Sequence, residues 1–232
     1  MRILTGTSGY SYKEWKGAFY PEDMPASGML RYYAERFPAV EINNTFYRMP
    51  RAEVLAAWAE QVPEGFRFAL KASQRITHHR RLNDAADSVD YFFRVATTLG
   101  GALGPTLFQL PPNFAKDLPR LESFLRDLPP ACRAAFEFRH ASWFDREVFD
   151  ALSAARAALC LAEDETLATP VEATTDWGYL RLRRQDYAEA DLVSWLDRIR
   201  RQPWSEAYVF FKHEDEARGP ALAEALAKIS AA

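Results

Sequence analysis

The stretches Val40-Glu41-Ile42-Asn43 and Phe136-Glu137-Phe138-Arg139 decide the fold. In each, apolar and polar residues alternate with a period of two, which places them on opposite faces of a β-strand. One face of such a strand packs against apolar neighbours. The other face carries charged residues, although a strand buried on both sides is normally apolar on both faces. These charges indicate a functional role.

Eight strand-like segments are separated by helical patterns along the chain. They span residues 2–8, 39–43, 67–73, 105–110, 134–139, 158–164, 177–183 and 207–213. Amphipathic stretches with helical spacing span residues 29–37, 51–61, 84–99, 118–128, 145–157, 191–201 and 220–229. This repeated order of strand and helix predicts an α/β protein with a single (β/α)8 barrel of the TIM type. We expect the sixth helix to be degenerate or missing, because residues 165–176 hold Pro170 and several Thr.

Length and composition predict one globular domain over residues 1–232. A chain of 232 residues is close to the ~250 typical of this barrel and leaves little room for a second domain. A hydrophobic fraction of 48% fills a large core, and a net charge of -3 favours neither a nucleic-acid nor a membrane partner. Cys132 and Cys160 lack metal-site spacing and are expected to be reduced. Since no signal-peptide or membrane-spanning pattern is present, we expect a cytoplasmic protein.

Charge gathers on the inward faces of the predicted strands. We choose for each strand the parity that turns the larger apolar residues outward. The inward set is then Ser8, Glu41, Asn43, Lys71, Ser73, Gln109, Glu137, Arg139, Asp164, Tyr179 and Arg181. Most of these residues fall in the last turn of their strands, so they meet at one mouth of the barrel. On the last strand, either Lys212 or His213 points inward.

Acids and bases share this mouth. Lys71, Arg139 and Arg181 are the bases expected to grip a phosphate or carboxylate, and Glu41 and Glu137 are the acids expected to exchange protons. Isolated charges there would each cost several kcal/mol to desolvate, so they must pair with one another or with a ligand.

Further candidates flank these charges. His140 is a third candidate catalytic residue, because histidine titrates near neutral pH. Asn43 and Gln109 are expected to orient hydroxyl groups, and Trp15 or Trp143 to stack on a sugar ring. The leading interpretation is an enzyme that acts on a small anionic substrate, either phosphorylated or sugar-like, at the C-terminal face of the strands.

Three other interpretations stay open. In the first, the charges at the mouth only neutralise one another and have a structural role. In the second, the barrel binds a ligand but does not catalyse a reaction. In the third, the basic run 75–81, with His78 and His79, tracks nucleic acid in a metal-dependent phosphodiesterase related by fold to endonuclease IV. No metal ligands are assigned, because three bases occupy the same mouth. No cofactor is predicted, with a divalent metal kept as an alternative.

Several motifs occur in one order along the whole chain. They are Gly6-Thr-Ser-Gly-Tyr10, Phe19-Tyr-Pro21, Glu41-Ile-Asn-Asn-Thr-Phe-Tyr47, Lys71 with Ile76-Thr-His78, Gln109-Leu-Pro-Pro112 and Glu137-Phe-Arg-His-Ala-Ser-Trp143. Together they resemble the YecE-like family, a domain of unknown function that is sometimes labelled sugar-isomerase-related. The resemblance implies a TIM-type barrel and no established activity. The chain departs from the family pattern at Arg181-Leu-Arg-Arg184 and Phe211-Lys-His-Glu214, where it adds cationic or titratable groups.

Overall fold

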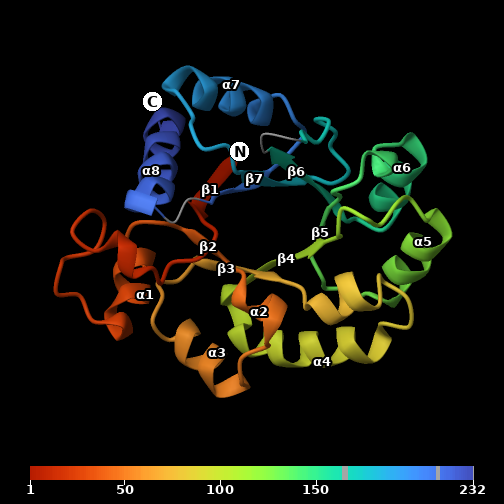
Figure 1. The fold of residues 1–232 in the computed structure, drawn as a ribbon, viewed down its shortest axis with the longest axis horizontal. Helices are drawn as coiled ribbons and strands as arrows, with labels where there is room; N and C mark the ends of the chain where they lie inside the picture. Colours follow the sequence, from red (N-terminus) through yellow and green to blue (C-terminus); the bar gives the residue numbers. More distant parts are fainter. Residues whose placement is uncertain (164–166, 213–214, 232) are drawn as a thin grey trace.

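Eight parallel strands form a nearly closed barrel with helices around its outside (Figure 1). The computed structural model describes residues 1–163, 167–212 and 215–231. The strands are β1 (Arg2–Thr7), β2 (Ala39–Ile42), β3 (Arg67–Lys71), β4 (Leu103–Gln109), β5 (Ala134–Glu137), β6 (Ala158–Glu163), β7 (Trp177–Leu182) and β8 (Glu206–Phe211). They are hydrogen-bonded in the order β1-β8-β7-β6-β5-β4-β3-β2. The predicted (β/α)8 barrel is confirmed, although its strands end one or two residues earlier than predicted.

The helices occupy the crossovers between strands. They are α1 (Ala26–Ala34), α2 (Asn44–Tyr47), α3 (Ala52–Ala59), α4 (Ala86–Ala96), α5 (Leu118–Asp127), α6 (Arg146–Ala154), α7 (Glu189–Arg200) and α8 (Arg218–Ala231). Short turns of helix are η1 (Lys13–Trp15), η2 (Arg75–His79), η3 (Thr97–Ala102), η4 (Ala141–Trp143) and η5 (Asp215–Ala217). The crossover from β6 to β7 contains no helix over its described residues 167–176, as the sequence predicts.

The seam between β1 and β2 closes around one tyrosine. The hydroxyl of Tyr33, on α1, accepts a hydrogen bond from Thr7 N at 2.8 Å and donates one to Ala39 O at 3.1 Å. Nearer the mouth, Gly9 N donates to Glu41 O at 2.8 Å. These bonds satisfy backbone groups of both strands that would otherwise lie buried without partners.

Side chains of complementary size fill the interior of the barrel. Large rings come from β7 and β8, and mostly small side chains come from the other six strands. The interior set is Leu4, Ala39, Ala69, Leu107, Ala135, Ala158, Cys160, Ala162, Trp177, Tyr179, Tyr208 and Phe210. A second and larger apolar cluster packs the outer faces of the strands against the helices. The interior is therefore a packed core that supports whatever lies at the mouth.

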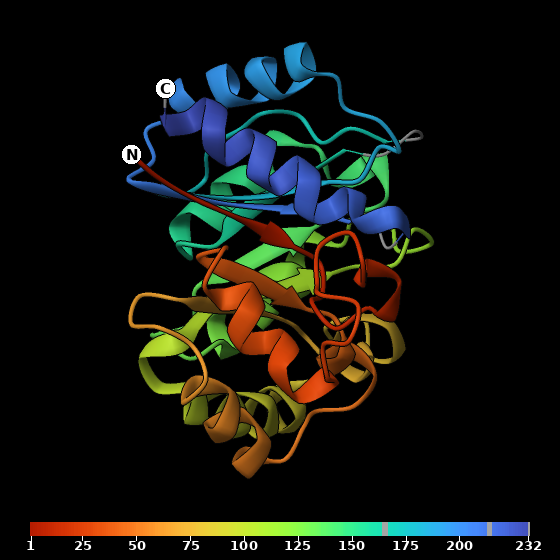
Figure 2. The same cartoon turned by 90° about the vertical axis from the view of Figure 1, so that its left-hand side faces the viewer.

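Both termini lie at one end of the molecule, and the arrow of β1 points away from that end (Figure 2). The C-terminal ends of the parallel strands therefore open at the opposite end, where the long loop after β1 also lies. Among the helices of the described residues, none is both long and apolar enough to cross a membrane.

We expect Gly6→Ala to destabilise the barrel at its seam. A Cβ atom at this position would lie 2.1 Å from Ala39 O and 3.0 Å from the Tyr33 hydroxyl, so β1 and β2 must separate to admit it. Such overpacking costs about 2–3 kcal/mol. The melting temperature should fall by roughly 4–10 °C in differential scanning fluorimetry. Gly101→Ala is the matched control, because its Cβ would meet no atom within 4 Å. Equal melting temperatures for the two variants would contradict this account of the seam.

Candidate functional site

A buried ion-pair network closes the floor of the barrel mouth. Arg181, on β7, places its Nη2 2.9 Å from Glu41 Oε1 on β2 and its Nη1 2.5 Å from Glu137 Oε2 on β5. The three side chains are at most 3% exposed. One guanidinium therefore joins two carboxylates that come from different parts of the barrel wall.

Hydrogen bonds complete the surroundings of Glu41. Ser8 Oγ donates to Oε1 at 2.7 Å, and the Tyr179 hydroxyl donates to Oε2 at 2.7 Å. Asn43 Nδ2 also donates to Oε1, at 3.3 Å. Burial raises the pKa of Glu41, but attraction to Arg181 and these hydrogen bonds outweigh burial and hold the pKa below its usual range. Glu41 is therefore ionised at neutral pH.

Glu137 is held in the same way by neighbouring strands. Gln109 Nε2, on β4, donates to Oε2 at 2.9 Å, and Arg183 Nη2 lies 3.0 Å from Oε1. Burial raises the pKa of Glu137, but attraction to Arg181 and Arg183 outweighs burial and lowers the pKa to about 2. A carboxylate with so low a pKa is a weak base at neutral pH. The geometry therefore does not favour the proton-exchange role that the sequence suggests for Glu41 and Glu137.

Arg183 is a floor residue absent from the predicted inward set, although the stretch Arg181-Leu-Arg-Arg184 is noted above for its added cationic groups. It lies just past the end of β7 and shares the inward parity of Tyr179 and Arg181. Continuing that parity by two residues would have found it. Gln109 and Arg181 are likewise floor residues, since their polar groups bind Glu137. Arg181 was predicted to bind an anionic ligand, and in the structure it binds the carboxylates of Glu41 and Glu137 instead.

Lys71 stands apart from this floor. It is the last residue of β3 and half-buried, and its Nζ lies 4.0 Å from the centroid of the Phe46 ring. Within the described part of the chain, Nζ forms no ion pair. Burial and then repulsion from Arg181 lower the pKa of Lys71 to about 8, and attraction to Glu41 and Glu137 only partly opposes them.

Other basic side chains lie near Lys71. His78, on η2, packs edge-on against Phe46 at a centroid distance of 4.9 Å. Burial, followed by repulsion from Lys71, lowers the pKa of His78, and Arg139 contributes to the same effect. Arg139 and Lys212 are exposed. Lys212 also repels Lys71, which places it near the mouth. His213, the other alternative on the last strand, lies outside the described residues.

Three of the predicted residues have other roles in the structure. Trp15 is 1% exposed and stacks on Tyr20, and Trp143 is 0% exposed and donates from Nε1 to Phe114 O. Neither ring presents a face to a ligand. His140 caps η4, where its Nδ1 accepts a hydrogen bond from Ser142 N at 3.2 Å. Two further predicted mouth residues, Asp164 and His213, lie outside the described residues.

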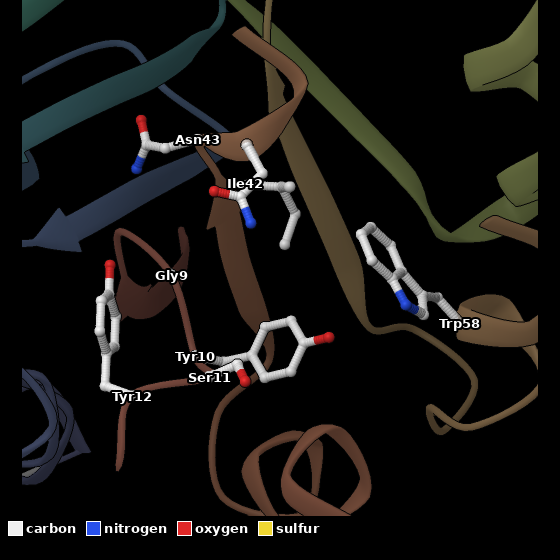
Figure 3. Close-up of a pocket in the computed structure, with 8 residues that line it drawn as sticks. Gly9, Tyr10, Ser11, Tyr12, Ile42, Asn43 and Trp58 are labelled. Carbon is white, nitrogen blue, oxygen red and sulfur yellow. The ribbon is translucent and has the colours of Figure 1, made fainter. Parts of the chain in front are cut away.

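A small cavity lies beside the mouth, between the loop after β1 and α3 (Figure 3). It encloses about 170 Å³ and is lined in part by Tyr10, Tyr12, Asn43 and Trp58. Asn43 connects this cavity to the floor through its hydrogen bond to Glu41. The space is suited to a small organic group, because one water molecule occupies about 30 Å³ of the liquid.

A wider groove of about 700 Å³ lies on the outer side of the rim. Arg75, His79 and Arg80 line it together with the exposed rings of Tyr47 and Tyr91. Within residues 1–163, 167–212 and 215–231, no three His, Cys, Asp or Glu side chains come together as ligands for a metal ion. The divalent metal therefore stays an untested alternative.

Comparison with known proteins identifies related chains. The family model described as protein of unknown function DUF72 matches residues 4–232. UPF0759 protein YecE of Escherichia coli K12 is 36% identical over 50% of this chain and 43% of its own length. UPF0759 protein YunF of Bacillus subtilis is 31% identical over 64% of this chain and 54% of its own. The matched stretch thus spans about half the length of these curated relatives.

Two crystal structures share the fold of this chain. A DUF72 family protein from Thermotoga maritima MSB8 has a TM-score of 0.85 at 24% identity, with 100% of both chains covered. A DUF72 family protein from Enterococcus faecalis V583 has a TM-score of 0.80 at 17% identity, with 99% and 96% covered.

We expect Arg181→Met to destabilise the protein in a pH-dependent way. In the unaltered protein the lowered carboxyl pKa values contribute stability above about pH 4.5, and this contribution is lost as the pH falls towards 2. Without Arg181, burial raises the pKa of Glu41, so stability should instead fall as the pH rises above about 4.5. The loss at pH 7 should be about 3–5 kcal/mol.

Urea unfolding between about pH 2 and pH 8 measures both effects. Arg146→Met is the control, because the ion pairs of Arg146 are at the surface, where its side chain is 74% exposed. It should cost no more than about 1 kcal/mol. Parallel pH dependences for Arg181→Met and the unaltered protein would contradict the assignment of Arg181 as the counterion of Glu41.

Proposed function

This chain belongs to the DUF72 family, and we propose that it is an enzyme that acts on a small anionic substrate, phosphorylated or sugar-like, at the C-terminal mouth of the barrel. The observation that carries the proposal is the division of charge at the mouth. The two carboxylates of the floor are matched by the guanidiniums of Arg181 and Arg183. Lys71, Arg139 and Lys212 lie around them. Over the described residues, the rim is therefore positive above a balanced floor.

A positive rim of this kind attracts and holds anions. Ammonium and guanidinium groups form charge-assisted hydrogen bonds with phosphate and carboxylate oxygens. Arg139 is suited to this role because its side chain is exposed and forms no ion pair within the described residues. Lys71 is the second cation, and it lies closer to the floor.

The cavity beside the mouth favours a compact substrate. It provides about 170 Å³ and the Asn43 side chain next to the cationic rim. An uncharged part of the substrate that carries hydroxyl groups would lie there, with its anionic group over the rim. A barrel that places its polar groups at the C-terminal ends of the strands is the arrangement in which TIM-barrel enzymes build their sites.

The groove outside the rim favours a second candidate, nucleic-acid binding. Arg75, His79 and Arg80 beside Tyr47 and Tyr91 combine positive charge with exposed rings, on which unpaired bases stack. Affinity for a single-stranded oligonucleotide would then fall steeply with salt concentration. An affinity that is absent, or that salt does not change, would remove this candidate.

We expect Arg139→Gln to weaken anion binding without loss of stability. A thermal-shift screen of sugar phosphates should find compounds that stabilise the unaltered protein, by about 2.7 kcal/mol at a concentration of one hundred times Kd. Because the variant loses a charge-assisted hydrogen bond, its Kd should rise about 10-fold to 100-fold.

Arg126→Gln is the matched control, because Arg126 is exposed in the last turn of α5, away from the mouth. It should bind as the unaltered protein does. If no anionic compound stabilises the protein, or if both variants bind equally, the proposed anion site is wrong. NMR of each stabilising compound after incubation with the protein then separates an enzyme from a barrel that binds without turnover.

A further inference from the structure

Lys71 is held in a fixed position at the edge of the floor. Its carbonyl oxygen accepts a hydrogen bond from Thr45 Oγ1 at 2.7 Å, and Thr45 is buried. Thr45 also precedes Phe46 on α2, so the same short helix anchors the backbone of Lys71 and places an aromatic ring 4.0 Å from its Nζ. The amine is thus constrained at both ends of its side chain.

Among the described residues, no carboxylate pairs with the amine of Lys71. Glu41 and Glu137, which come from β2 and β5, direct their oxygens to Arg181, Ser8, Tyr179, Gln109 and Arg183. Lys71 Nζ forms no ion pair in the part of the chain that the structure describes. Its electrostatic surroundings include Arg181 from β7, Lys212 after β8 and His78 from η2, as well as the two carboxylates.

These surroundings increase the share of neutral amine at Lys71, although the ammonium form still predominates at pH 7. Burial and the repulsion from Arg181 and Lys212 lower the pKa of Lys71 from 10.5 to about 8. Near pH 7 the share of neutral amine is then on the order of a hundredfold larger than for an exposed lysine. A neutral amine at the C-terminal end of a barrel strand is the form that attacks a carbonyl carbon.

We propose that Lys71 is a catalytic nucleophile that forms an imine with the carbonyl carbon of the anionic substrate. The inference rests on the proposed function and deepens it, because it restricts the substrate to an aldehyde or ketone that carries a phosphate or carboxylate. Arg139 and Lys212 would hold the anionic group, and the carbonyl would face Nζ.

The step balances without a further reactant. The ammonium group loses one proton, and the neutral nitrogen forms a bond to the carbonyl carbon to give a carbinolamine. The carbonyl oxygen then leaves as water, taking up two protons from the nitrogen and its surroundings, while a C=N bond forms. Overall, an ammonium and a carbonyl give a protonated imine and one water, so atoms and charge are conserved.

Reductive trapping of the full chain tests the proposal. The probe is dihydroxyacetone phosphate with cyanoborohydride, which converts an imine into a stable secondary amine that peptide mass spectrometry locates. We expect an adduct on Lys71 at a rate at least tenfold higher than on any other lysine of the chain. The internal controls are Lys13, Lys16, Lys116, Lys212 and Lys228. The rate of imine formation at Lys71 should rise with pH and be half-maximal near pH 8, the pKa that its surroundings give it.

Two comparisons separate this inference from the proposed function. Lys71→Arg should keep phosphate binding within about threefold and lose the trapped adduct, whereas Lys228→Arg should keep both. Glycerol 3-phosphate, which has the charge but no carbonyl, should stabilise the protein without forming an adduct. Stabilisation by both phosphates with no adduct, or with adducts spread evenly over the lysines, would overturn the nucleophile and leave the anion site standing. No stabilisation and no adduct would overturn both.

Discussion

The contact between Arg181 and the carboxylates of Glu41 and Glu137 is the constraint on which the mouth of this barrel depends. Two carboxylates buried at 0% exposure require a cation in direct contact, because isolated ions in a protein interior are very costly. One guanidinium meets this requirement for both, since its two terminal nitrogens bind one carboxylate each. The pairing links β2, β5 and β7, so it fixes how these strands lie around the interior.

The packing below the floor holds Arg181 within reach of both carboxylates. Tyr179 precedes Arg181 by two residues on the same inner face of β7, and its ring fills the interior opposite small side chains such as Ala69 and Ala135. Its hydroxyl also donates to Glu41. One strand thus provides a ring for the interior, a hydrogen bond for one carboxylate and a guanidinium for both. The apolar core and the polar floor meet at Tyr179, and a change of its size would affect both.

Most of the fold and about half of the site could be predicted from the sequence. The difference between the two has a physical reason. Alternation with a period of two is a local property, and it identified the barrel and the inward parity of Glu41, Glu137 and Arg181. Pairing between distant strands is not local, so the sequence left open whether these charges pair with one another or with a ligand. Trp15 and Trp143 were assigned to the rim because they follow strands. Both are buried instead, since loops also need apolar packing and their amphipathic pattern is irregular.

The separation of a fixed floor from a titratable rim follows from the same contact. Because Arg181 occupies both carboxylates, neither of them is free to pair with Lys71, and the charge of Arg181 repels the amine. A carboxylate in contact with Lys71 would instead have raised the pKa of the amine and kept it charged. Burial is the largest cause of the lowered pKa of Lys71, and the interaction that stabilises the mouth adds to it through Arg181. This is why we propose Lys71, at the end of β3, as the reactive group of the mouth, and not Glu41 or Glu137, which the sequence suggests first.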